Sequence, residues 1–245
     1  MKDYDINNIV RDVRITIDQN MSESALAGFG DTDTLALDDI IKSKIVDAAM
    51  LIFDNAPINM IGDAALCKNA MVIYKKVYNS DKSYYAEIAV PSTFYRLVSF
   101  KMNGWKKSIT DEDLIYPTDE EYAVQRSRIE GVRGCSERPI LAYVPNIDEG
   151  DNEYCFEAYS CTNNDPYAFT YLPLPMITDD NKISLPQELY KSIVYATAYL
   201  TAIAFNSDNQ AMRLLSVAKQ LAKIGDSIQQ QPIVPQYDNS QNVQQ

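Results

Sequence analysis

The feature that most constrains this chain is a change in hydrophobic periodicity along its length. Apolar residues recur at helical spacing near both ends, whereas residues 71–173 contain short Tyr- and Val-rich runs separated by turn residues. Helix and strand patterns bury different sets of side chains, so one segment cannot satisfy both. The sequence therefore predicts an α+β fold, in which helices from the two ends form one bundle that carries an inserted β-rich domain.

Two helices are predicted at the N-terminal end, over residues 3–19 and 35–54. Asp38 and Asp39 would lie in the first turn of the second helix, where carboxylates favour the positive end of the helix dipole, and Pro57 ends the segment. A single stripe on the first helix indicates a side that packs on a common core. The residues of that stripe are Ile6, Ile9, Val10, Val13 and Ile17.

Three hairpins are predicted in the middle of the chain. Asn103-Gly104 gives the strongest signal, because these residues tolerate the positive φ angles of a two-residue turn. Thr118 and Glu121 form a capping-box pattern, which predicts a short helix reaching about Arg128. The paired strands are expected at residues 71–77 with 84–90, 94–102 with 106–109, and 138–144 with 153–160.

Helical spacing returns in the C-terminal part. Ser184 with Gln187 forms another capping-box pattern and predicts a helix to about Phe205, and a last helix is expected from Ser207 to Gly225. The predicted organisation is an N-terminal helical pair at 1–58, a β-rich domain at 59–183, a C-terminal helical pair at 184–225 that packs on the first, and an extended Gln-rich tail at 226–245.

Composition excludes several classes of function. The 245 residues include 34 acidic and 22 basic residues, which gives a formal charge of −12, and there is no histidine. Ser-His-Asp and Cys-His nucleophile systems and His-ligated zinc are therefore excluded. The acidic balance also argues against a protein that grips nucleic acid through its phosphates, because that requires a basic surface.

The chain is expected to be a soluble protein from a reducing compartment, with no membrane association. Its first residues lack the pattern of a signal peptide. The longest nearly apolar run, Ile193 to Phe205, has 13 residues, whereas a membrane-spanning helix needs about 20. None of the four cysteines lies in a C-x-x-C pair, and we expect all four to be free structural thiols.

Motifs of known enzyme chemistry are missing from the sequence. It contains neither the dinucleotide-binding glycine pattern nor a P-loop, and Gly28-Phe29-Gly30 precedes no basic residue that would meet a phosphate. The acidic segments 31–34 and 148–151 do not follow the order of a calcium-binding loop. We therefore expect a protein that is not an enzyme, with no catalytic residue, no cofactor and no metal ion.

The helix predicted after Pro186 has no polar face over its second half. A helix that is apolar all round must be buried on every side. Two interpretations stay open: a central core helix, or a helix packed partly against a second subunit. Tyr195 and Tyr199 are the candidate interface residues of the second interpretation.

The segment Pro91–Lys107 resembles part of the head-to-tail connector (adaptor ring) proteins of tailed bacteriophages, including the ring proteins of crAss-like phages. The shared pattern is a Pro-x-x-Phe-x-Arg-Leu-Val strand followed by a Gly-Trp turn and a basic return strand. The surroundings agree with it: an N-terminal helical hairpin, Arg138-Pro139 entering a strand, and a closing Leu-Pro-x-Glu-Leu helix before the Gln-rich tail. The β-rich part of this chain is larger than in the simplest helical adaptors.

The resemblance implies a structural virion protein at the head-tail junction, assembled in the cytoplasm of a bacterial host. Twelve copies would form a ring between the capsid portal and the tail, with the portal protein and neighbouring connector or tail rings as partners. The genomic DNA would pass through the ring during ejection without specific binding. A negative channel wall suits that passage, because a basic wall would hold the phosphates.

Two further candidate contacts come from single features. Trp105, beside the predicted tight turn, is either a core residue or an exposed anchor for a neighbour, and the resemblance favours the anchor. The tail has too few apolar residues to fold alone, but Ile233, Val234 and Tyr237 are grouped around Pro235. We expect the tail to be ordered by a neighbouring subunit or ring, with those three residues as anchors.

Two alternatives from other classes stay open. One is a hydrolase that uses two carboxylates, for which the sequence supplies acids but no recognisable pair. The other is a module on a helical base whose β-rich part binds a glycan or peptide, since many of the 17 tyrosines lie there and aromatic rings stack on sugars.

Overall fold

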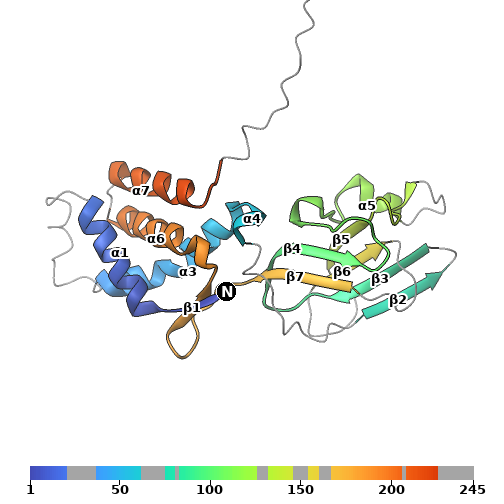
Figure 1. Cartoon of the computed structure of the whole chain (residues 1–245), viewed down its shortest axis with the longest axis horizontal. Helices are drawn as coiled ribbons and strands as arrows, with labels where there is room; N and C mark the ends of the chain where they lie inside the picture. The colour runs from blue at the N-terminus through green and yellow to red at the C-terminus, as the bar shows by residue number, and fades with distance from the viewer. Residues whose placement is uncertain are drawn as a thin grey trace, which may run out of the picture.

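Most helices lie at one end of an elongated molecule and most strands at the other, and the N-terminus lies between them (Figure 1). The computed structural model describes residues 1–20, 37–61, 75–80, 83–125, 132–145, 154–159, 167–205 and 208–225. The α+β class predicted from the sequence is confirmed. Among the described residues, no helix has both the length and the apolar character needed to cross a bilayer.

Four helices share one aliphatic core, and α6 contacts each of the other three. Fully buried side chains such as Ile9, Ile45, Ile193 and Leu214 come from all four, so segments from both ends of the chain meet in this core. A short helix follows the second of them at Ile58–Ile61 (α4). The four are α1 (Ile6–Asn20), α3 (Leu37–Asn55), α6 (Tyr190–Ala204) and α7 (Asp208–Leu221).

A two-stranded antiparallel sheet also joins the two ends of the chain. It pairs β1 (Lys2–Asp5) with β8 (Lys182–Leu185). The prediction of helix from residue 3 is therefore wrong at its start, because the first residues form a strand and α1 begins at Ile6. The expected cap at Ser184 is also wrong, since Ser184 lies in β8 and its hydroxyl donates a hydrogen bond to the Asp3 carboxylate.

Pairing between segments that are distant in sequence explains both corrections. A strand partner satisfies the backbone groups of residues 2–5 and 182–185, and a local capping pattern carries no information about such a partner. The chain then enters the core through a 3₁₀ turn at Gln187–Leu189, and α6 follows directly.

Two antiparallel sheets build the β-rich part. The four-stranded sheet has the order β2 (Lys75–Ser80), β3 (Ser83–Ala89), β6 (Tyr154–Tyr159), β5 (Ile140–Pro145). The second sheet pairs β4 (Phe94–Met102) with β7 (Tyr167–Pro173). The β2–β3 and β5–β6 hairpins confirm two of the three predicted; residues 71–74 lie outside the described residues.

The third predicted hairpin, at Asn103-Gly104, is only partly present. Gly104 has the positive φ expected of the turn, 88°. The return segment 106–109 forms no strand and contributes one bridge, between Ile109 and Phe100. β4 pairs instead with β7, whose Phe169 and Tyr171 bury aromatic rings that the lysine-bearing return segment cannot supply.

Aromatic side chains fill the space between the two sheets. Phe94 lies at the centre of this cluster, with its ring centroid 5.5–6.2 Å from the rings of Tyr143, Phe156, Phe169 and Tyr171. The opposite face of the four-stranded sheet carries a smaller cluster. Tyr122 packs on that cluster from α5 (Glu120–Gln125), the described part of the helix predicted after Thr118.

The hydrophobic cores divide at the middle of the molecule. The aliphatic core draws almost entirely on residues 6–61 and 183–222, and the two β clusters on residues 86–171. Val98 and Leu172 are the exceptions, since they belong to β4 and β7 but their side chains pack in the aliphatic core. The domain boundaries expected after residues 58 and 183 stay predictions.

Candidate functional site

The segment that carries the family resemblance lies where the two parts of the molecule meet. Its strand β4 faces both cores: Val98 packs in the aliphatic core, whereas Leu97 and Phe100 pack in the aromatic one. Register shifts between Phe94 and Arg96 and between Leu97 and Ser99 allow adjacent residues to be buried on both sides. The strand therefore contains bulges and is buried on both sides.

Arg96 is the main polar link across the junction. Its Nη1 donates hydrogen bonds to the carbonyl oxygens of Phe53 and Ala56, at 2.8 and 2.6 Å, where α3 ends. Its Nε donates to Oδ2 of Asp111 at 3.0 Å, and only 13% of the Arg96 side chain is exposed. A cation at the carbonyl end of a helix is favoured by the helix dipole, and the aspartate offsets the cost of burying the charge.

Tyr95 makes a second link from the same strand to the same helix end. Its hydroxyl donates a hydrogen bond to Asp54, and its ring lies 6.3 Å from that of Phe53. Burial and then the hydrogen bond to the Asp54 carboxylate raise the pKa of Tyr95, so the hydroxyl keeps its proton and stays a donor.

These contacts form a junction with a definite chemistry, which we call the β4–α3 clamp and define as Asp54, Tyr95, Arg96 and Asp111. The clamp ties the C-terminal end of α3 to the start of β4, so it fixes how these two elements lie relative to each other. The motif contains this arginine, and the sequence alone assigns it no role. The available signal was an arginine directly before the apolar pair Leu97-Val98, because a buried guanidinium requires several acceptors.

Trp105 is a core residue in this chain. Only 3% of it is exposed, and its ring lies 5.7 Å from that of Phe100 in the aromatic cluster. The expectation of an exposed anchor is therefore corrected. The reason is that the turn at Asn103-Gly104 folds the following residues back over β4, where an indole buries a large apolar area.

Tyr195 and Tyr199 lie on the side of α6 that α1, α3 and α7 do not fully cover. Together with Ile203 they occupy positions spaced by four residues, which form a row along the helix. The two tyrosines are half-buried, and Ile203 is 41% exposed. The remaining surface of α6 is mostly buried against α1, α3 and α7, so the helix is a core helix with one uncovered apolar row.

The three predicted tail anchors, Ile233, Val234 and Tyr237, lie outside the described residues. Their contacts stay predictions.

One buried carboxylate stands out in the β-rich part. Glu157 is 4% exposed and accepts a hydrogen bond from the Tyr159 hydroxyl, and Glu87 lies directly opposite it on β3. The tyrosine bond gives Glu157 a structural partner within its own strand. Among the described residues, no group of acidic or cysteine side chains is arranged to hold a metal ion, and Cys135 and Cys155 are free thiols.

No protein-family model matches the chain, and no curated protein matches it.

Proposed function

We propose that this protein is a structural virion component, one subunit of a ring that connects the capsid portal to the tail of a bacteriophage and surrounds the path of the genome. The proposal begins from the resemblance of the Pro91–Lys107 segment. The structure supports it by the role of that segment, whose Tyr95 and Arg96 hold the helical and β-rich parts together.

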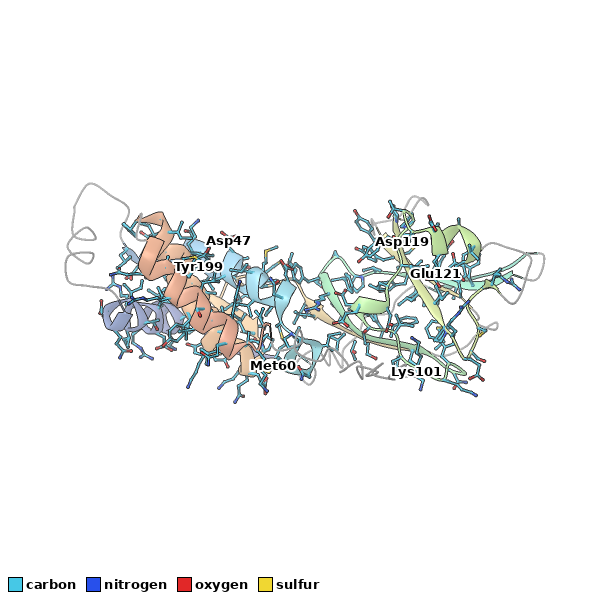
Figure 2. All side chains as sticks on the ribbon, turned by 90° about the horizontal axis from the view of Figure 1, so that it is seen from above. Asp47, Met60, Lys101, Asp119, Glu121 and Tyr199 are labelled. Atoms are coloured by element: carbon cyan, nitrogen blue, oxygen red, sulfur yellow. The ribbon has the colours of Figure 1, made fainter. Side chains whose placement is uncertain are left out.

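The observation that carries the proposal is the apolar row on α6, formed by Tyr195, Tyr199 and Ile203. Central helices of a monomeric protein are usually covered on all sides, and a partly uncovered apolar row on such a helix fits a contact with another protein. A neighbouring subunit in a ring would cover it. Figure 2 shows Tyr199 in the helical part, away from the β-rich end.

The charge of the chain suits a channel protein. With a formal charge of −12, a ring of such subunits presents an acidic surface, and DNA passing through it would be repelled rather than held. Binding of DNA with an affinity that falls steeply with salt would contradict this part of the proposal.

Imaging of virions tests the proposal most directly. We expect antibody or gold labelling of the protein to mark the head-tail junction, and averaged images of that junction to show a closed ring containing it. Tyr199→Ala with Ile203→Ser should leave the subunit folded and reduce its incorporation into particles. The matched control is Met176→Ser, which removes an exposed apolar side chain from a loop of the β7–β8 connection. A protein found outside particles as a strict monomer would contradict the proposal.

The tail gives a second test. Truncation after Gly225 removes residues 226–245 and should leave the described helices and strands intact. If the tail binds a neighbouring subunit or ring, the truncated chain will enter particles poorly. Triple substitution of Ile233, Val234 and Tyr237 by serine should reproduce the defect without shortening the chain, and normal infectivity of both variants would refute the role of the tail.

A further inference from the structure

Three tyrosines form an exposed aromatic surface on the β-rich part. The rings of Tyr143 and Tyr154 are stacked, 4.9 Å apart and 7° from parallel, and the ring of Tyr116 meets Tyr143 edge-on at 6.3 Å. Tyr116 and Tyr154 are 45% and 41% exposed. Tyr143 connects them to the core through Phe94, so the surface is held rigidly from beneath.

Acidic side chains border this surface. Residues 108–125 contain six acidic residues and no basic one. Oδ2 of Asp119 accepts a hydrogen bond from the backbone N–H of Tyr116 at 2.7 Å, which places this carboxylate at the aromatic rings. Within the described part of the chain, Arg96 pairs with Asp111 and Lys107 with Asp113, whereas Glu112, Asp119, Glu120 and Glu121 have no ion pair.

The outer face of α7 has the opposite character. The bases of α7 are Arg213 and Lys219, its one acid is Asp208 at the start of the helix, and Lys223 follows its end, in a chain whose formal charge is −12. Arg213 and Lys219 are exposed beside Met212, which is 61% exposed and is the most exposed large apolar side chain described. Neither base has an ion pair among the described residues. The inner side of the same helix, with Leu214 and Ala218, is buried against the core.

We propose that the tyrosine surface (Tyr116, Tyr143 and Tyr154, with Asp119, Glu120 and Glu121) binds the outer face of α7 (Met212, Arg213 and Lys219) of a second copy of this chain. The chemistry of the two surfaces matches: guanidinium and ammonium groups bind tyrosine faces and carboxylates, and a methionine thioether packs on aromatic rings. Acidic and basic surfaces of one chain that complement each other select another copy as the partner.

One molecule cannot make this contact with itself. α7 lies in the helical part and α5, which follows Tyr116, lies in the β-rich part at the other end of the elongated molecule (Figure 1). Each copy therefore offers one surface to the copy before it and the other to the copy after it. Such a heterologous contact closes into a ring when its rotation closes. The inference thus deepens the proposed function and depends on it.

Charge exchange on the purified full-length protein tests the contact. Arg213→Glu with Lys219→Glu reverses the α7 face, and Glu120→Lys with Glu121→Lys reverses the border of the tyrosine surface. We expect each pair to abolish self-association in sedimentation and light-scattering measurements, and the chain that carries all four substitutions to regain it. Tyr154→Ala should weaken self-association at least tenfold without any change of charge.

Asp47→Lys and Lys101→Glu are the matched controls, because both residues are exposed and lie elsewhere on the molecule (Figure 2). If the contact forms as proposed, both control variants should self-associate as strongly as the natural chain. Circular dichroism separates a lost contact from a lost fold. If the charge-reversed variants form the same oligomers as the natural chain, the inferred contact is wrong and the ring proposal is unaffected. A natural chain that stays monomeric up to its solubility limit, and is absent from the head-tail junction, overturns both.

Discussion

The helical part and the β-rich part of this protein are held together by different kinds of side chain. The core of the helical part is built mainly of isoleucine, alanine, valine and leucine, whereas the larger core of the β-rich part centres on Phe94, Phe100, Phe156 and Phe169. Aliphatic packing depends mostly on filled volume, while aromatic rings also require particular mutual orientations. The two parts should therefore respond differently to the loss of one large side chain.

The comparison also concerns how each core is assembled along the chain. The helical core brings together segments that are almost 200 residues apart, and the β1–β8 pair joins them again at the surface. The β-rich part contains two hairpins, β2–β3 and β5–β6, and its other two strand pairs, β3–β6 and β4–β7, join segments that are distant in sequence. Formation of the helical core must consequently wait for the end of the chain, whereas the hairpins can form from neighbouring residues.

The largest expected effect comes from Phe156→Ala. This side chain is fully buried and its ring lies 5.5–6.0 Å from those of Phe94, Tyr143, Phe169 and Phe100. Its removal should lower the free energy of unfolding by about 3–5 kcal/mol. The near-ultraviolet circular dichroism of the aromatic cluster should weaken with it.

A smaller change in the helical core is Ile193→Val, which removes one methylene group from a fully buried residue of α6. We expect a loss of about 0.5–1.5 kcal/mol there, with the near-ultraviolet signal unchanged. A near-ultraviolet signal that weakens in Ile193→Val as much as in Phe156→Ala would show that the two cores do not respond independently.

Substitution of Arg96 should have the next largest effect, because the clamp links the two parts. Arg96→Gln leaves the Asp111 carboxylate and at least one carbonyl of α3 without their donor, which should cost about 1.5–3 kcal/mol. Arg96→Lys keeps the charge and should recover part of this stability. If the clamp fixes the junction, small-angle scattering will show a broader distribution of overall length for Arg96→Gln than for the natural chain.

The sequence contained enough information for the elements whose signals are local. Helical stripes located α1, α3 and α7 to within a few residues, and turn residues located the β2–β3 and β5–β6 hairpins. For α6 the sequence predicted an apolar helix and left open whether a core or a second subunit covers it; its candidate interface residues, Tyr195 and Tyr199, are half-buried.

Long-range pairing could not be predicted in the same way. β1–β8 and β4–β7 join residues that are distant in the chain, and a capping pattern at Ser184 or a turn at Gly104 gave no sign of either. The environment of Trp105 could not be predicted either, because a tryptophan beside a turn is compatible with both a core and an interface. The acceptors of Arg96 come from α3 and from Asp111, and only the folded chain brings them together.

A smaller effect is expected at the contact between α6 and α7. The buried hydroxyl of Ser192 donates a hydrogen bond to the carbonyl oxygen of Ala218 at 2.7 Å, and this bond joins the two helices. Ser192→Ala should lower the free energy of unfolding by about 1 kcal/mol, since the carbonyl also serves the helix itself. Ser216→Ala, on the exposed face of α7, is the control and should leave stability unchanged.

The smallest effect at neutral pH is expected from a tyrosine of the helical part. Burial and the hydrogen bond to Asp12, 2.6 Å long, raise the pKa of Tyr190 above its ordinary value of 10. Below pH 10 the hydroxyl is protonated in both the folded and the unfolded chain, so its contribution is fully present. Above pH 10 the unfolded chain loses this proton first, and stability therefore falls as the pH rises toward the folded pKa.

Tyr190→Phe separates the two pH ranges. At pH 7 it should cost less than about 1 kcal/mol, because the side chain is half-buried and water competes for the bond. Between pH 10 and 12 the variant should lose less stability than the natural chain, because the group responsible for part of the alkaline loss is gone. Tyr95→Phe should behave alike at the clamp, where the Asp54 carboxylate takes the place of Asp12. Tyr154→Phe changes an exposed tyrosine and serves as the control in urea unfolding across this pH range. If the three variants and the natural chain lose the same stability above pH 10, the hydrogen bonds of Tyr190 and Tyr95 do not cause the alkaline loss.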